Sequence, residues 1–147
     1  MATLPWTTTE SSAEAAHEAV VLGSRLELRS LRHVPAFLGA AMKLRRQVRT
    51  MPGALGVSLI AQPAHKTFWT LSAWVDQASL DGFVATPAHV AVMQRYHERM
   101  HGSAFTTWTT KVADLPESRS HATQLWSEAK ERLGSSTTGP TEGARHD

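Results

Sequence analysis

Apolar and polar residues follow a two-residue period in two stretches of the chain, which predicts strands. Between residues 20 and 30, Leu22, Ser24, Leu26 and Leu28 alternate with glycine and charged residues, and residues 55–62 repeat the pattern. Residues 67–76 form a further apolar strand after the turn-like stretch 62–66, so we expect a hairpin. The β-branched and aromatic residues of 103–111 predict a fourth strand.

Three stretches have the spacing of helices instead. Pro35 is well placed to open the first, in which apolar residues recur from Phe37 to Met51 before Pro52 and Gly53 end it. The second begins near Ser79, is interrupted at 86–87 by a threonine cap and a proline, and continues to about residue 102. The third covers residues 122–133 and ends at a glycine.

The predicted order of elements is βαββαβ followed by one more helix. This is the ferredoxin-like α+β fold, in which two helices cover one face of a four-stranded antiparallel sheet. The other face needs a cover, which either the extra C-terminal helix or a second copy of the sheet could supply. We expect a flexible arm at 1–17 in which only Trp6 docks, a single domain at 18–134, and a disordered tail at 135–147.

Composition narrows the class of protein. The 147 residues are 41% hydrophobic and 19% charged, with a net charge of +2 and no cysteine, which excludes disulfides and thiolate chemistry. The N-terminal residues lack the features of a secretory signal, and no apolar run is long enough to span a bilayer. We expect a cytoplasmic protein that binds neither membrane nor nucleic acid.

Four cations in the first helix lie mostly away from its apolar stripe: Lys43, Arg45, Arg46 and Arg49. A solvated helix face is the favoured interpretation, and an anion or nucleic-acid patch is the alternative. Asp76, directly after the third strand, is expected to cap the following helix rather than to act as a base.

The second helix predicts a cavity. At 100° per residue its inward sector contains His89, Met93, Tyr96, His97 and Met100, which is unusually polar for a buried face. Each buried imidazole or phenol needs a hydrogen-bond partner, so these residues either have partners within the core, are half-exposed, or line a hollow. For one histidine alone the first two interpretations are favoured, whereas the cluster favours a lined cavity.

The third strand could supply the opposite wall. Phe68, Thr70, Ser72 and Trp74 share one face, and residues 69, 71, 73 and 75 share the other. If the first set faces the second helix, it stands opposite His89 and His97 in a mostly apolar pocket with a few polar anchors. If the parity is reversed, these residues line a dimer interface.

No established motif for metal or phosphate binding accompanies this cavity. His97 and His101 have a spacing that can chelate a metal on a helix, but no carboxylate or cysteine completes a site, so we predict none. The chain also lacks a Gly-rich phosphate loop and a GxSxG nucleophile elbow.

The stretch SAWVDQASLDGFVATPAHVAVM resembles the antibiotic biosynthesis monooxygenases of the dimeric α+β barrel superfamily. Trp74 and Asp76 match a Trp-x-Asp motif at the end of a strand, and residues 86–89 are similar to a Thr-Pro-His motif with Ala88 inserted. The resemblance covers about residues 20–111 and includes the turn Pro52–Gly56. Two departures are Phe83, where many relatives have a histidine, and Met93, at the position of the axial histidine of haem-degrading relatives.

The resemblance implies a homodimer whose two sheets pack into a barrel, with a cavity between sheet and helices in each subunit. Relatives include cofactor-independent oxygenases that act on aromatic polyketides, haem-degrading oxygenases, and cyclases or lyases. The leading hypothesis is therefore a cofactor-independent oxygenase for a flat aromatic substrate. The alternatives are a haem protein with His89 or His97 as axial ligand, and a non-catalytic dimeric module that binds a ligand.

Each candidate residue has a role in the leading hypothesis. Trp74 would stack on the substrate, with Phe83, Met93 and Met100 completing the apolar lining. His89 or His97 would take a phenolic proton, leaving an electron-rich anion that reacts with oxygen. Hydroxyl groups would bind the oxygen that gains charge, and the candidates are those of Tyr96, Thr70 and Ser72.

Overall fold

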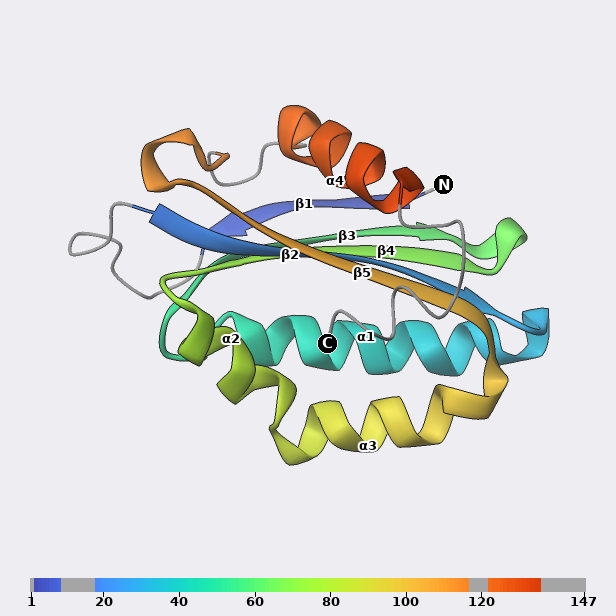
Figure 1. Cartoon of the computed structure of the whole chain (residues 1–147). Helices are drawn as coiled ribbons and strands as arrows, with labels where there is room; N and C mark the ends of the chain where they lie inside the picture. The colour runs from blue at the N-terminus through green and yellow to red at the C-terminus, as the bar shows by residue number, and fades with distance from the viewer. Residues whose placement is uncertain (1, 9–17, 117–121, 136–147) are drawn as a thin grey trace.

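The computed structural model describes residues 2–8, 18–116 and 122–135 (Figure 1). They form a twisted antiparallel sheet with helices on both faces. The strands are β1 (Ala2–Thr8), β2 (Glu18–Leu28), β3 (Ala54–Gln62), β4 (Thr67–Trp74) and β5 (Met100–Lys111), in the order β1-β3-β4-β2-β5. The four strands β3-β4-β2-β5 confirm the predicted ferredoxin-like α+β fold, and the short turn Pro63–His65 closes the predicted hairpin of β3 and β4.

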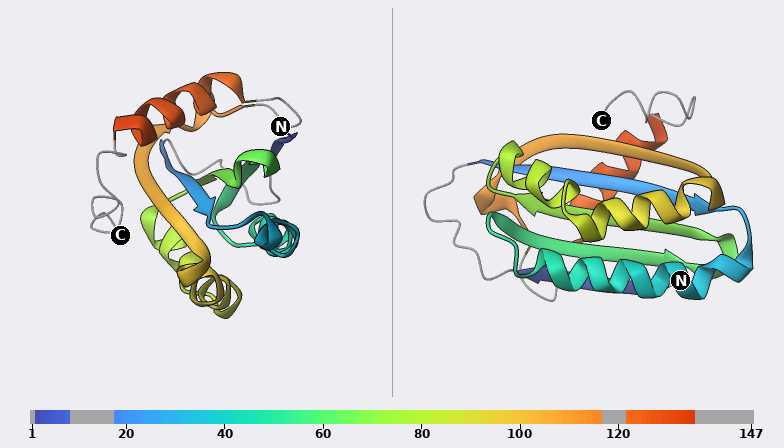
Figure 2. Two further views of the ribbon diagram at one scale, coloured as in Figure 1. Left: turned by 90° about the vertical axis from the view of Figure 1, so that its right-hand side faces the viewer. Right: turned by 90° about the horizontal axis from the view of Figure 1, so that it is seen from below.

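Three helices lie on one face of the sheet: α1 (Val34–Val48), α2 (Gln77–Val84) and α3 (Pro87–Tyr96). Figure 2 shows α1 and α3 lying across this face, with the strands visible between them. Asp76 and Thr86 cap α2 and α3 as predicted, although α2 begins at Gln77, two residues before the expected start. Asp76 accepts a hydrogen bond from the Ser79 backbone N–H at 2.8 Å, and Thr86 accepts one from that of His89 at 3.4 Å. The hydrogen bonds from Ser79 lower the pKa of the Asp76 carboxyl, as expected of a capping carboxylate.

The fourth helix, α4 (Thr123–Ser135), lies on the opposite face, which we call the outer face of the sheet (Figure 1). Leu125, Trp126 and Ala129 of α4 pack against Val21 of β2 and Leu71 of β4 in one apolar cluster. The Trp126 indole donates a hydrogen bond of 3.2 Å to the Ser58 hydroxyl and is thereby satisfied within the core. The sequence allowed either the C-terminal helix or a second sheet to cover this face, and in this structure α4 covers it.

The strand β1 differs from the expected flexible arm. Residues 2–8 pair with β3 and add a fifth strand at that edge of the four-stranded core, and the register shifts between Leu4 and Thr7, around a proline that has no N–H to donate. Trp6 does dock, with only 1% of its surface exposed. The strand has no alternating pattern because backbone hydrogen bonds and this one indole hold it in place. Residues 1 and 9–17 of the expected arm and 136–147 of the expected tail lie outside the described residues, whereas Ser135, expected in the tail, is the last residue of a helix.

Within the described residues, no helix is long and apolar enough to cross a membrane.

Candidate functional site

A small cavity lies between the sheet and the helices α1 and α3, and we call it the inner cavity. Its volume is about 110 Å³. Most of its lining is apolar, and the polar side chains include two hydroxyls of β4, one of β2, an imidazole of α3 and a guanidinium of α1. The residues that concern the argument are Leu22, Ser24, Arg45, Thr70, Ser72, Phe83, His89, Met93, Met100 and Phe105.

The parity of β4 decides which of its side chains reach this cavity. Phe68 makes an edge contact with Phe37 of α1 at 4.8 Å between ring centroids, whereas Leu71 and Ala73 belong to the cluster under α4. The even-numbered residues therefore face α1–α3, as one of the two alternatives predicted. Thr70 and Ser72 line the inner cavity, and the Thr70 hydroxyl is hydrogen-bonded to that of Ser24, its register partner on β2.

His89, at the start of α3, forms part of the wall of the inner cavity. Its ring meets Phe83 edge-on with 5.1 Å between centroids. Burial lowers the pKa of the imidazole, and a hydrogen bond to the backbone of Val84 opposes this effect. Its Nδ1 is buried and has no hydrogen-bond partner among the described residues. Because the other ring nitrogen makes the hydrogen bond to the Val84 backbone, it carries the proton of the neutral ring, and Nδ1 is left as a hydrogen-bond acceptor.

A larger depression adjoins the inner cavity on the α2–α3 side of the sheet, opposite to the outer face. We call it the outer groove, because it is open to solvent. It has a volume of about 690 Å³ and runs between α2, α3 and the edge strand β5. The two spaces share Leu22, His89, Met93 and Phe105. Val84 and Val90, which line the groove, are two of the three large apolar side chains that are exposed in the described part of the chain. His89 thus stands where an open apolar groove meets a polar-anchored pocket.

Trp74 lies behind this site and does not line it. The indole is fully buried, donates a hydrogen bond of 2.9 Å to the Ser72 hydroxyl, and stacks on Phe83 with 5.3 Å between ring centroids. Trp74 therefore supports two lining residues, and in this structure its stacking partner is Phe83. Phe83 in turn contacts the ring of His89 edge-on. The rings of Trp74, Phe83 and His89 therefore form one continuous row of contacts.

Two of the four remaining candidates, His97 and Tyr96, do not line the inner cavity. His97 is exposed, and the expectation that it faces inward is wrong, because α3 ends at Tyr96 and residues 97–99 form a 3₁₀ turn. Tyr96 is buried against Phe37, with 4.9 Å between ring centroids, but lines a different groove, between α1 and α3. Met93 lines the inner cavity as predicted, and Met100 also lines it, but from the first position of β5 rather than from a helix.

Arg45 is a lining residue that the sequence analysis placed away from the apolar stripe. Burial lowers the pKa of its guanidinium, and the charge of Arg49 adds to this effect. Its position was readable from the sequence, because residue 45 follows Ala41 by one helical turn and so lies beside the buried face. Ser24 was placed on the correct strand face but was not singled out.

The described residues contain no group of three or more histidine, aspartate or glutamate side chains placed to hold a metal ion.

Comparisons with known proteins bear on this arrangement. Residues 32–95 match the family model for antibiotic biosynthesis monooxygenases. The matched stretch runs from the start of α1 to the last turn of α3, and so includes most of the residues around the inner cavity. The resemblance predicted from the Trp-x-Asp and Thr-Pro motifs is thereby confirmed. No curated protein sequence matches the chain.

Solved structures with the same fold include one that is described as an oxygenase. SnoaB from Streptomyces nogalater, described as a cofactor-independent oxygenase, is 15% identical with a TM-score of 0.54, over 67% of this chain and 98% of that one. The Shewanella oneidensis protein SO0527 is 17% identical with a TM-score of 0.55, over 72% and 97% of the two chains. A Lactobacillus acidophilus protein with a proposed monooxygenase assignment is 13% identical with a TM-score of 0.58, over 72% of this chain. The match spans about half (49%) of that protein's length. These likenesses establish the shared fold.

Proposed function

We propose that the protein is a small-molecule enzyme of the monooxygenase type, which binds a flat phenolic substrate between the sheet and α3 and oxidises it with molecular oxygen. The observation that carries the proposal is the buried, unpartnered Nδ1 of His89 at the junction of the inner cavity and the outer groove. A buried acceptor without a partner is costly, and a phenolic O–H of a bound substrate would satisfy it.

His89 is the proposed base. Its lowered pKa keeps the imidazole neutral at pH 7, so that Nδ1 can accept the phenolic proton. Phe83 holds the ring from one side, and the Val84 backbone fixes the other nitrogen. The resulting phenolate is electron-rich and is the species expected to react with oxygen.

The oxidation balances without an external reductant. For a substrate with a ring CH₂ group in conjugation with the phenol, one atom of O₂ becomes the new carbonyl oxygen. The other atom leaves as water with the two hydrogens of the CH₂ group. The polar groups that face the developing negative charge are the hydroxyls of Thr70 and Ser72 and the guanidinium of Arg45. They would stabilise the oxyanion in a site largely shielded from water.

The size of the spaces sets how the substrate lies. Sites for drug-sized ligands have volumes of roughly 300 to 1,000 Å³, so the inner cavity at about 110 Å³ holds one ring or less and the outer groove at about 690 Å³ holds the remainder. A substrate of two or three fused rings would pass from the groove into the cavity between Met93 and Phe105. The flexible side chain of Met93 can move to admit it.

The homodimer implied by the family resemblance stays a proposal. In the barrel arrangement a second sheet would pack on the outer face, which α4 covers in this chain. A second copy would therefore contact the outer surface of α4 or another part of the molecule, unless α4 moves.

Haem is too large for the inner cavity alone, which has a volume of about 110 Å³, so a haem held by His89 would lie mainly in the outer groove of about 690 Å³. Of the two histidines considered as axial ligands, only His89 lines a cavity. We expect haem added to the purified protein to give no shifted Soret band. A stoichiometric Soret shift that is lost in His89→Ala would favour the haem alternative over the oxygenase.

The proposal is tested first by binding and then by turnover. Phenols of one, two and three fused rings are screened by thermal shift, the two- and three-ring members being chosen with the ring CH₂ group in conjugation with the phenol that the balanced oxidation needs, and those that bind are assayed for oxygen uptake. We expect two- and three-ring phenols to raise Tm and to consume oxygen. Binding without oxygen uptake for every phenol would favour a non-catalytic ligand-binding module, and no binding at all would overturn the proposal.

A matched pair of variants locates the chemistry. Thr70→Val removes a hydroxyl that lines the inner cavity, and Thr109→Val makes the same change at an exposed position of β5. We expect Thr70→Val to lower kcat about 100-fold, as the loss of one oxyanion donor typically does, and Thr109→Val to leave kcat unchanged. Equal kcat values for the two variants would remove Thr70 from the proposed mechanism.

A further inference from the structure

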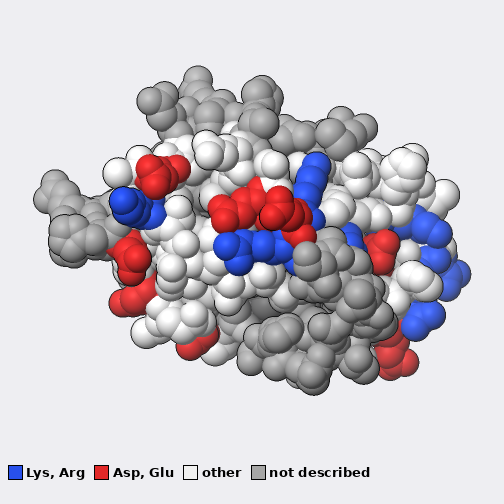
Figure 3. All heavy atoms as spheres, turned by 45° about the horizontal axis from the view of Figure 1, so that its top comes forward, with Lys and Arg blue, Asp and Glu red and all other residues white. Residues whose placement is uncertain are grey.

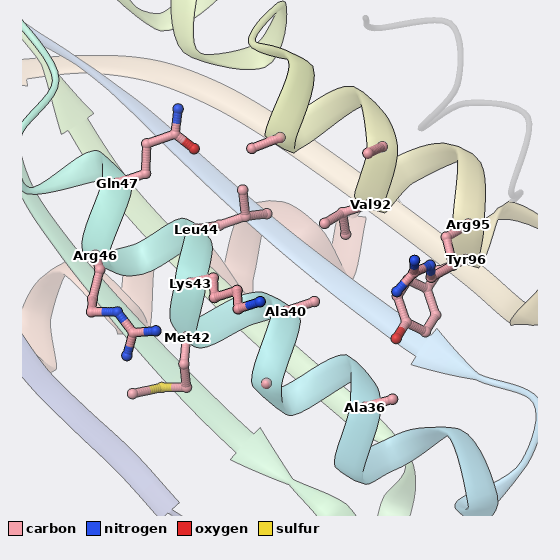
Figure 4. Close-up of a pocket in the computed structure, with 13 residues that line it drawn as sticks. Ala36, Ala40, Met42, Lys43, Leu44, Arg46, Gln47, Val92, Arg95 and Tyr96 are labelled. Atoms are coloured by element: carbon pink, nitrogen blue, oxygen red, sulfur yellow. The ribbon is translucent and has the colours of Figure 1, made fainter.

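A second groove lies on the side of the helices that faces away from the sheet. It runs between α1 and α3 and has a volume of about 550 Å³ (Figure 4). It meets the inner cavity only at Leu44 and Val92, whose side chains line both spaces. Because His89, Thr70, Ser72 and Arg45, which carry the proposed mechanism, do not line it, its occupant can be distinguished from the substrate of the inner cavity.

The charge of this groove has one sign. Lys43 and Arg46 of α1 and Arg95 of α3 line it, and no acidic side chain does so. In Figure 4, Lys43 and Arg95 extend toward the space between the two helices, whereas Arg46 points to the other side of α1. The salt bridge identified within the described residues is Arg132 to Glu128 on α4, so Lys43 and Arg95 have no ion-pair partner there.

The surface of α4 has a different character. Figure 3 shows acidic and basic side chains interspersed over that face, and α4 itself exposes Glu128, Lys130, Glu131 and Arg132. A solvated helix face with mixed charges needs no ligand to balance it. Two cations that converge on a concave space without any anion create a positive potential, which raises the local concentration of negatively charged ligands.

The floor of the groove is small and apolar. Ala40 of α1 and Ala88 and Ala91 of α3 line it, together with Gly39. A Cβ atom placed on Gly39 would meet no atom within 4 Å, so there is open space directly above the helix backbone. A flat apolar group can therefore approach both helices closely while its charged end reaches Lys43 and Arg95.

We infer that the groove between α1 and α3 is a binding site for a small aromatic anion, with the acidic group held by Lys43 and Arg95 and the apolar body seated on Gly39 and the alanines. The volume of about 550 Å³ lies within the usual range for small-molecule sites, roughly 300 to 1,000 Å³. The inference is independent of the proposed oxygenase activity, because it concerns other residues and another ligand.

The test uses a matched pair of ligands. 2-Naphthoate and the neutral 2-naphthamide have the same ring system and differ in charge, and each is titrated into the ¹⁵N-labelled full chain. We expect naphthoate to shift the backbone amide signals of Gly39, Ala40 and Ala91 in a saturable manner that weakens with salt, and naphthamide to bind at least tenfold more weakly. A parallel titration with 2-naphthyl phosphate shows whether a carboxylate or a phosphate is preferred.

Variants separate this site from the inner cavity. Hydrogen bonds to charged groups contribute enough that losing one weakens binding roughly tenfold, so we expect Lys43→Gln and Arg95→Gln each to raise the Kd of naphthoate about tenfold. Lys130→Gln, an exposed cation on α4, should leave that Kd unchanged.

A second pair of variants blocks the groove without removing charge. Gly39→Leu places a side chain in the open space, and Gly82→Leu does the same on α2, where a Cβ would also meet nothing within 4 Å. Both variants should fold, because leucine favours a helix more than glycine does. We expect Gly39→Leu alone to abolish naphthoate binding. Equal Kd values for the two leucine variants, or shifts centred on Phe83 and His89 instead, would overturn the inference.

Discussion

At the scale of single residues, the site depends on which nitrogen of His89 is free. The predicted inward face of the second helix contained two histidines, and the structure keeps only one of them at the cavity. His89 lies in the first turn of α3, where the helical period holds, whereas His97 follows the last helical residue and turns outward. A periodicity argument is reliable within a helix and fails at its end, because the next residues no longer share its axis.

The lowered pKa of His89 predicts an acid-side loss of stability. Burial holds its folded-state pKa below the unfolded value of 6.5, so the unfolded state binds more protons as the pH falls below 6.5. The contribution of His89 is therefore fully present above pH 6.5 and is lost as the pH falls through the folded-state pKa. His89→Gln, which does not titrate, should lose less free energy of unfolding between pH 7.5 and pH 5 than the wild type does.

Urea denaturation at the two pH values measures this difference. His101→Gln serves as the control, because it is the same substitution at an exposed position. An identical pH dependence in wild type and His89→Gln would mean that the imidazole is not buried as described.

The hydrogen bond from Trp74 to Ser72 predicts a coupled pair. Ser72→Ala leaves the buried indole N–H without its acceptor, which should cost about 1 to 3 kcal/mol of the free energy of unfolding. In a Trp74→Phe background no such donor remains, so the same substitution should cost measurably less. A double-mutant cycle by urea denaturation gives the coupling, and additive effects of the two substitutions would show that this hydrogen bond does not form.

At the scale of elements, the order and type of the segments from residue 18 to 135 could be predicted from the sequence, and β1 could not. Alternation, proline at helix starts and capping side chains are local signals, and each strand and helix of the core carries at least one of them. The strand β1 depends on a neighbour 50 residues away, the edge of β3, and on the one indole that fits over Gly56. A contact of that kind leaves no periodic pattern in the strand itself.

The fit of Trp6 over Gly56 predicts a strong effect of a single methyl group. A Cβ on Gly56 would lie 2.1 Å from the Trp6 ring, so Gly56→Ala must displace the indole or the strand. Overpacking of this kind typically costs about 1 to 3 kcal/mol in the free energy of unfolding. In a Trp6→Ala background the ring is gone, and Gly56→Ala should then have little effect.

Urea denaturation of the two single variants and the double variant checks this expectation. If Gly56→Ala destabilised the chain equally with and without Trp6, the strand β1 would not be docked on β3 through this residue.

At the scale of the whole molecule, α4 closes the outer face of the sheet within one chain. Its apolar residues and those of β2, β4 and β5 form a single cluster, in which Ala129 is fully buried and lies close to Gly23. The sequence alone did not decide whether a helix or a second sheet covers this face, because either would bury the same apolar residues. The choice depends on whether α4 reaches back over the sheet, which its own sequence does not encode.

Releasing α4 should therefore promote self-association. Ala129→Glu places a charge in the cluster beneath the helix, and Gln124→Glu adds the same charge at an exposed position of α4. We expect Ala129→Glu to increase the weight-average mass in sedimentation velocity as the outer face becomes available to other copies, while Gln124→Glu behaves as the wild type does. An unchanged mass for Ala129→Glu would mean that α4 is not what keeps this face from pairing.

The most direct test of the account is oxygen uptake by wild type and His89→Gln, measured side by side with the two- or three-ring phenol that gives the largest thermal shift. The account predicts sustained uptake by the wild type that declines only as the pH falls through the lowered folded-state pKa of His89, and at least a 100-fold lower kcat in His89→Gln at an unchanged Tm at pH 7.5. Equal turnover by the two proteins would contradict the assignment of His89 as the base and, with it, the inner cavity as the active site.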